Sequence, residues 1–252
     1  MNIRFDGKIV AVSGAGHGIG RAVARSFAGL GAAVFAADHN AANLAETASV
    51  GNITPHTVDL SDRRAAAGWI AEVERLNGGA AVFALVNNCG GVAGQTAQPI
   101  EEVTDEDWDR IFAVNIGAAM ALSRAVAPGM KRAGRGRIIN ISSGAGLQAS
   151  LTGIQAYCSA KHAVVGLTRQ LAHDLGPFGI TVNSVAPGFI RSNPDTEKQW
   201  DSYGADGQQA LVERIALKHL GTAQDIANGV IFFASGLADF VSGQILQVDG
   251  GR

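Results

Sequence analysis

Apolar runs and segments of helical period alternate along this chain, and the N-terminal part shows the whole pattern once. An apolar run at residues 9–12 leads into the glycine-rich sequence SGAGHGIG at 13–20. A helical period follows, and its apolar face is formed by Ile19, Val23, Phe27 and Leu30. A second apolar run, at 33–37, ends on Asp38. The pattern predicts a strand, a tight turn, a helix and a second strand in succession.

The same alternation continues to the end of the chain. Further apolar runs that predict strands lie at 55–59, 80–86, 137–141, 180–186 and 245–248. Helices are predicted at 41–49, 59–76, from 104 onward, and at 154–175, 209–217 and 222–234. Pro128-Gly129 should kink the helix that begins at 104, and residues 191–208 are the most polar and turn-rich stretch. Alternating strands and helices predict an α/β fold: a Rossmann-type, doubly wound parallel sheet of about seven strands with helices on both faces.

Composition favours one domain that spans residues 1–252. The hydrophobic fraction of 47% suffices for a large core, and the low charged fraction of 17% is typical of a sheet covered on both faces. The net charge of -2 argues against a nucleic-acid partner. The first residues lack an apolar signal core, and no apolar stretch looks long enough to span a bilayer, so no membrane partner is expected. Cys89 and Cys158 fit no C-x-x-C spacing, which indicates reduced thiols and a cytoplasmic location.

The glycines of the first turn are spaced for a phosphate group. Gly14, Gly18 and Gly20 form the pattern G-x-x-x-G-x-G, which differs from the usual dinucleotide pattern G-x-G-x-x-G. Glycine lets the backbone turn sharply and lie close to a pyrophosphate, and a helix N-terminus favours an anion. A merely flexible turn is the alternative, and the flanking strand and helix argue against it.

Asp38 ends the second predicted strand, where a carboxylate would accept hydrogen bonds from the ribose diol of NAD and repel the 2′-phosphate of NADP. His39, the next residue, is neither Arg nor Lys, which also favours NAD, although His17 could meet a phosphate. Asp38 could instead cap the helix expected at 41–49.

Tyr157 and Lys161 stand at i and i+4 on a predicted helix, so their side chains are neighbours. An ammonium near a phenol lowers the phenol's pKa, which suits Tyr157 for proton transfer. Such a pair on its own is most often a surface pair. No cluster of His, Cys and Asp has metal-ligand spacing, so no metal is expected.

Nearly the whole chain resembles the short-chain dehydrogenase/reductase family, in the type whose members have about 250 residues. The resemblance rests on the following motifs: Gly14-x-x-x-Gly18-Ile19-Gly20, Asp59-Leu60, Asn87-Asn88-Cys89-Gly90, Asn115, Ser143, Tyr157-x-x-x-Lys161, Pro187-Gly188 and Val248-Asp249-Gly250-Gly251. It implies that Tyr157 is the general acid/base, that Lys161 lowers its pKa and holds the nicotinamide ribose, that Ser143 binds the substrate oxygen, and that Asn115 holds a water in a proton relay.

The resemblance also implies a set of cofactor-binding residues. These are Gly14, His17, Gly18, Ile19, Gly20, Asp38, Asp59, Leu60, Asn87, Gly90, Tyr157, Lys161, Pro187, Gly188, Ile190 and Ser192. Three positions depart from the family pattern. Cys89 stands where an Ala is usual, Ser192 stands where a Thr is usual, and either Ser142 or Ser143 could align with the catalytic serine, with Ser143 favoured.

The expected activity is NAD-dependent interconversion of a secondary alcohol and a ketone by hydride transfer, in a homotetramer. An NADPH-dependent carbonyl reductase and a non-catalytic cofactor-binding regulator are the alternatives. Trp200 and Tyr203 lie in a polar, glycine-broken stretch, so residues 191–213 are expected to form a substrate lid, although these aromatics could simply pack on the body of the protein.

Overall fold

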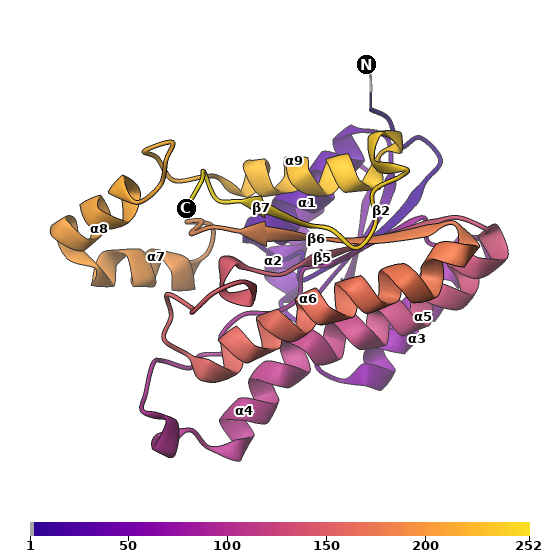
Figure 1. The fold of residues 1–252 in the computed structure, drawn as a ribbon. Helices are drawn as coiled ribbons and strands as arrows, with labels where there is room; N and C mark the ends of the chain where they lie inside the picture. Colours follow the sequence, from indigo (N-terminus) through magenta and orange to yellow (C-terminus); the bar gives the residue numbers. More distant parts are fainter. Residues whose placement is uncertain (1–2) are drawn as a thin grey trace.

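Seven strands form one parallel sheet in the computed structural model, which describes residues 3–252 (Figure 1). The strands are β1 (Ile9–Ser13), β2 (Ala33–Asp38), β3 (Ile53–Thr57), β4 (Ala84–Asn87), β5 (Gly136–Ile141), β6 (Ile180–Pro187) and β7 (Ile245–Val248). Their order across the sheet is β3-β2-β1-β4-β5-β6-β7, and every neighbouring pair is parallel. The predicted fold class is confirmed.

Helices cover both faces of the sheet (Figure 1). They are α1 (Gly18–Gly29), α2 (Ala41–Thr47), α3 (Arg63–Leu76), α4 (Asp105–Phe112), α5 (Ala118–Ala133), α6 (Gln155–Leu175), α7 (Pro194–Ser202), α8 (Gly204–Glu213) and α9 (Ala223–Ala234). One apolar core lies under α1 and α9, and a second lies under α3, α5 and the C-terminal part of α6. Both cores are built from alternate side chains of the central strands, as expected of a sheet buried on both faces.

The sheet order reverses direction at β1. The chain runs from β1 outward through β2 to β3, and then returns to place β4 on the other side of β1. The loops that follow β1 and β4 therefore leave the sheet toward opposite sides. Such a reversal opens a crevice at the carboxyl ends of the strands, where α/β proteins bind their ligands.

Two predicted strands have shifted bounds. β3 begins at Ile53 instead of residue 55 and includes Pro55, which an edge strand tolerates because one side of its backbone has no ladder partner. β4 begins only at Ala84, where pairing with Val10 of β1 starts, so residues 80–83 lead into the strand without belonging to it.

The long helix predicted from residue 104 is interrupted, but not where Pro128 predicts. α4 passes into a π-helical turn, Ala113–Gly117, and then into α5, which continues through Pro128 to Ala133. By length and composition the whole path, Asp105–Ala133, would suffice to cross a membrane, contrary to the sequence expectation. Half of the most apolar stretch of this path is buried, and α5 packs in the core with α3 and the sheet.

Residues 191–208 are mostly helical, so the prediction of a turn-rich stretch was wrong. Asn193 caps α7 through a capping box with Thr196, and Pro194 occupies the first turn. Tyr203 then separates α7 from α8, which begins at Gly204 with φ of 62° and replaces the helix predicted at 209–217. The two helices project beyond the carboxyl edge of the sheet (Figure 1), where a polar sequence has no core to face.

Candidate functional site

The glycine-rich turn lies between β1 and α1, against the loop that follows β4. Gly14 and Gly18 have φ of 62° and 56°, a region that favours glycine. A Cβ on Gly20 would lie 2.0 Å from the carbonyl oxygen of Gly14, so α1 packs directly on the turn. His17 is the exposed N-cap of α1 and makes no side-chain cap bond, which leaves the first N–H groups of the helix available to an anion.

Ser13 and Asn88 fasten this turn to the neighbouring strand. The Ser13 hydroxyl accepts hydrogen bonds from the backbone N–H groups of Asn88 (2.9 Å) and Cys89 (3.0 Å), and the Asn88 amide donates to Gly14 O (2.8 Å). The sequence analysis assigned no role to Ser13. A hydroxyl directly before the first glycine was the available signal.

Asp38 is buried at the end of β2, and both of its carboxylate oxygens accept backbone hydrogen bonds. Oδ2 accepts from Gly16 N at 2.9 Å and Oδ1 from Asn40 N at 3.0 Å, while His39 Nδ1 lies 3.3 Å from Oδ1. The N-cap of α2 is Asn40, so the alternative that Asp38 caps this helix was wrong. The carboxylate is instead held in place with lone pairs left for a ligand.

A cavity opens beside Asp38 across the carboxyl ends of β1, β2, β3 and β4. It is lined by Gly14, Asp38, His39, Val58, Asp59, Leu60, Ser61, Cys89 and Val114. Hydrogen bonds from Ser61 lower the pKa of Asp59, so this acid stays ionised. Burial raises the pKa of the Cys89 thiol to about 12, so this side chain lines the cavity as a protonated, unreactive thiol.

Tyr157 and Lys161 lie on α6 beside the ends of β4 and β5. Lys161 is buried, its Nζ donates to Ile141 O at 3.0 Å, and Nζ lies 5.7 Å from the centre of the Tyr157 ring. Burial lowers the pKa of Lys161 to about 8. Burial also raises the pKa of Tyr157, and a hydrogen bond with the Ser143 side chain opposes this rise. The lowering that the resemblance assigns to Lys161 is therefore not supplied by the protein's side chains alone.

Of the two candidate serines, the structure places Ser143 beside Tyr157. Ser142 is buried, accepts a hydrogen bond from Ser184 Oγ at 2.8 Å and faces Val185 O on β6. Ser143 Oγ caps a short 3₁₀ turn by accepting from Ala145 N and remains partly exposed. Of the two serines, Ser143 is thus the one whose hydroxyl lies beside the Tyr157 phenol.

Asn115 lies in the π-helical turn and holds the loop after β4. Its amide donates to Gly91 O (2.9 Å) and Ile111 O (2.8 Å), and its Oδ1 accepts from Gly91 N (3.1 Å). A Cβ on Gly90 would lie 2.5 Å from Asn115 Oδ1 and 3.3 Å from Lys161 Nζ, so Asn115 and Lys161 converge on this glycine. In this arrangement Asn115 positions the backbone that faces Lys161.

The remaining predicted cofactor residues differ in where they lie relative to the glycine turn. Ser192 lies over the glycine turn, with its carbonyl oxygen 2.9 Å from the position of a Cβ on Gly18, and Pro187-Gly188 ends β6 against Val248 and Asp249. Ile190 is buried and pairs with Gly221. The Asn87 side chain instead points into the protein, where its amide donates to Ser123 and Asn140, so only its backbone faces the site.

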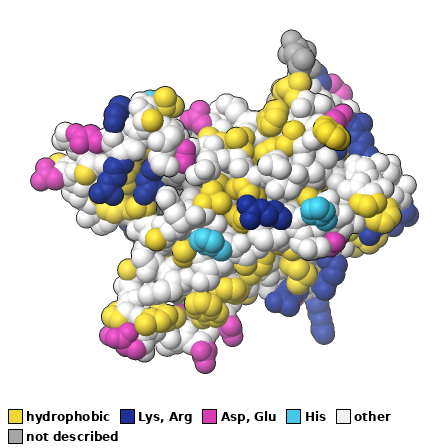
Figure 2. Space-filling model, in the orientation of Figure 1, with side chains coloured by type: hydrophobic (Ala, Val, Ile, Leu, Met, Phe, Trp, Pro, Cys, Tyr) yellow, Lys and Arg dark blue, Asp and Glu magenta, His cyan; other side chains and the backbone are white. Residues whose placement is uncertain are grey.

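Aromatic side chains connect the projecting helices to the end of β6. Phe189 stacks on Trp200 at 6.0 Å and lies 5.8 Å from Tyr203, and Arg191 lies over Trp200 while it pairs with Glu197. Figure 2 shows acidic and basic side chains mixed over this projecting part. Across residues 3–252 no group of His, Cys, Asp and Glu side chains is arranged to hold a metal ion.

The chain is similar along nearly its whole length to known proteins. A family model described as Enoyl-(Acyl carrier protein) reductase matches residues 14–252. The chain is 35% identical over 250 residues to the 2-dehydro-3-deoxy-D-gluconate 5-dehydrogenase of Bacillus subtilis, covering 97% of this chain and 94% of the relative. It is 33% identical over 251 residues to the 3-oxoacyl-(acyl-carrier-protein) reductase FabG of Rickettsia felis, covering 99% and 98%. The solved structure of 7α-hydroxysteroid dehydrogenase complexed with NADH and 7-oxo glycochenodeoxycholic acid matches with a TM-score of 0.89 and 32% identity, covering 99% of this chain and 97% of that one.

Proposed function

Because the chain belongs to the short-chain dehydrogenase/reductase family, a family of oxidoreductases that act between alcohols and carbonyls, we propose that it uses NAD to interconvert a secondary alcohol and a ketone. One observation carries the proposal: Tyr157, Ser143 and Lys161 meet at the carboxyl edge of the sheet, on the same edge as the glycine turn and Asp38. The three relatives are named for a sugar acid, an acyl carrier and a steroid. The proposed substrates are therefore a class, secondary alcohols and the corresponding ketones.

The residues at this edge suit a nicotinamide dinucleotide. The glycine turn presents bare backbone and free N–H groups to the pyrophosphate, and the buried Asp38 carboxylate offers acceptors to a ribose diol. Ser192 and the Pro187-Gly188 turn would enclose the nicotinamide half, and Lys161 would hold its ribose. When bound, the nicotinamide ring supplies the hydride chemistry.

In the proposed reaction, the chain's own residues move and hold the proton. Tyr157 removes the hydroxyl proton of the alcohol in oxidation and returns it to the carbonyl oxygen in reduction. Ser143 donates a hydrogen bond to the same oxygen, and so stabilises the charge that develops there. The Lys161 ammonium lies close enough to favour the phenolate form of Tyr157 as charge develops. Asn115 keeps the loop at Gly90 and Gly91 in register with Lys161.

The first test is a Tyr157→Phe variant. We expect loss of turnover by about a thousandfold or more because the proton has no other acceptor at this position. NAD should still bind with nearly the affinity of the wild type, since the glycine turn, Asp38 and Lys161 are unchanged in this variant. Steady-state kinetics with a panel of secondary alcohols and calorimetric titration of NAD measure the two quantities.

The same titrations separate the alternatives. Tighter binding of NADP than of NAD by the wild type would replace the proposal with an NADPH-dependent carbonyl reductase. NAD binding without turnover on any alcohol or ketone of the panel would favour a cofactor-binding regulator. Undiminished activity of Tyr157→Phe would overturn the mechanism.

We further propose that residues 1–252 act as one catalytic unit in a cytoplasmic homotetramer, with residues 191–213 as its substrate lid. Phe240 is fully exposed, and Leu237 and Leu246 are more than a third exposed on the C-terminal segment, which supports burial against another copy. Sedimentation equilibrium should give four times the mass of one chain, and a monomer mass at micromolar concentration would contradict the tetramer.

A further inference from the structure

We infer that Arg21 is a positioning residue for cofactor selection: it holds Gly16, and through this residue it fixes the Asp38 carboxylate. The inference rests on the proposed function, because it assigns a cause to the ribose selectivity proposed for Asp38. Arg21 belongs to α1 and does not itself face the cavity beside Asp38.

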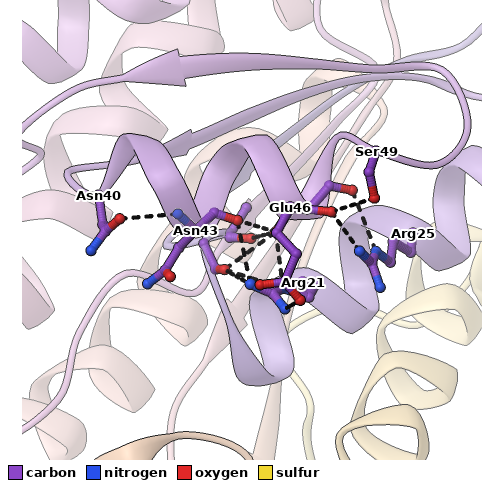
Figure 3. Close-up of polar contacts among 9 residues, drawn as sticks. Arg21, Arg25, Asn40, Asn43, Glu46 and Ser49 are labelled. Carbon is purple, nitrogen blue, oxygen red and sulfur yellow. Dashed lines mark hydrogen bonds and ion pairs between the residues drawn. The ribbon is translucent and has the colours of Figure 1, made fainter.

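Arg21 contacts two separate parts of the chain, the glycine turn and α2 (Figure 3). Its Nη2 and Nε donate to Gly16 O at 2.6 and 3.2 Å, so the guanidinium binds the glycine turn with two nitrogens. Nε also donates to Thr47 Oγ1 at 3.1 Å, and Nη2 donates to Asn43 O at 3.3 Å. Nη1 pairs with the Glu46 carboxylate. The side chain is mostly buried, so these charge-assisted bonds hold it in one orientation.

Gly16 transmits this hold to Asp38. Its carbonyl accepts from the Arg21 cation, and its N–H, which belongs to the preceding Ala15–Gly16 peptide, donates to Asp38 Oδ2 at 2.9 Å. That preceding peptide is also tied to Arg21, because Arg21 Nε donates to Thr47 Oγ1 and the Thr47 hydroxyl donates to Ala15 O at 2.8 Å. The space is also closed: a Cβ on Gly16 would lie 2.8 Å from Asp38 Cγ. A small shift of Gly16 would therefore displace the carboxylate.

Helix α2 closes a ring of contacts around Asp38. Asn40, its N-cap, donates its backbone N–H to Asp38 Oδ1 at 3.0 Å. At the other end of the helix, the buried Thr47 donates its hydroxyl to Ala15 O at 2.8 Å, next to Gly16. Both carboxylate oxygens are thus fixed by backbone groups whose places depend on α2, and Arg21 joins α2 to the glycine turn.

Arg25 provides a matched control one turn further along α1. It donates to Glu46 O and to Thr47 O (3.3 Å), so it also ties α1 to the end of α2. It makes no hydrogen bond to residues 14–16. Loss of either arginine should loosen α2, but only loss of Arg21 should free Gly16.

The experiment titrates NAD and NADP into the wild type and into Arg21→Gln, Arg21→Lys, Arg25→Gln and Asp38→Ala. Asp38→Ala defines complete loss of discrimination, because it removes the carboxylate that repels the 2′-phosphate. We expect Arg21→Gln to weaken NAD binding about tenfold and to move the NAD:NADP affinity ratio toward that of Asp38→Ala. Arg21→Lys should recover part of the ratio, since an ammonium can bond Gly16 O alone. Arg25→Gln should leave the ratio within about twofold of the wild type, even where its thermal midpoint falls as far as that of Arg21→Gln.

Three outcomes decide the question. An Arg21→Gln variant with the wild-type ratio overturns the inference, as does an Arg25→Gln variant whose ratio changes equally. Failure of the wild type itself to bind NAD would instead remove the proposed function. Circular dichroism and thermal unfolding of each variant show that it is folded before its affinities are compared.

Discussion

At the scale of single residues, Lys161 shows a conflict between stability and proposed use. Its amine is buried and has one hydrogen bond, to Ile141 O, so the charged form is costly and its pKa falls to about 8. The proposed chemistry nevertheless needs an ammonium beside Tyr157. Active sites commonly hold groups that destabilise the fold, because selection acts on the reaction as well as on stability.

The prediction is that Lys161→Met stabilises the protein while it abolishes turnover. Below pH 8 the amine is protonated in both the folded and the unfolded chain, so the folded chain carries the whole cost of the buried charge. A pKa lowered from 10.5 to about 8 corresponds to about 3 kcal/mol at most. Between pH 8 and 10.5 the folded protein has released this proton while the unfolded chain retains it, so the free energy of unfolding of the wild type rises with pH.

Chemical denaturation of wild type and Lys161→Met at pH 7 and pH 10 measures this difference. The advantage of the variant should be largest at pH 7 and should shrink toward pH 10. A variant less stable than the wild type at pH 7 would show that the packing and hydrogen bond of Lys161 outweigh the cost of its charge.

At the scale of elements, α7 and α8 are the part most free to respond to a ligand. They project beyond the sheet and are joined to it through the stack of Phe189 on Trp200. Ser192, just before α7, lies against Gly18 of the phosphate turn, so a dinucleotide there would press on the base of α7. The proposed lid is thus connected to both halves of the site.

We therefore expect NAD binding to change the fluorescence of Trp200, since a displacement of α7 alters its stack with Phe189. Trp69 and Trp108 lie elsewhere, on α3 and α4, and serve as controls. The change should persist in Trp69→Phe and Trp108→Phe and disappear in Trp200→Phe. A signal that survives in Trp200→Phe would argue against a moving lid.

The elements also show what the sequence can and cannot predict. Strand and helix order followed from apolar periodicity because the sheet is buried on both faces, and Tyr157 and Lys161 meet because helical spacing is local. Asn193-Pro194 is a typical helix start, and it begins α7. The polar composition of residues 191–208 instead favoured a prediction of turns. The contacts of Arg21 with Thr47 and of Ser13 with Asn88 join segments 26 and 75 residues apart, and no local pattern encodes them.

At the scale of the whole molecule, the reversal of strand order at β1 has a consequence for how the chain assembles. The Ser13 hydroxyl donates to Val86 O and accepts from Asn88 N, groups 73 and 75 residues away. The turn that would receive the pyrophosphate therefore cannot take its final shape during synthesis until β4 has emerged and docked beside β1. Parallel pairing across such a separation carries a large loop-closure cost and is slow. In a chain with this strand order the cofactor site therefore forms late, because it needs both β1 and β4 and these two strands are synthesised far apart in time.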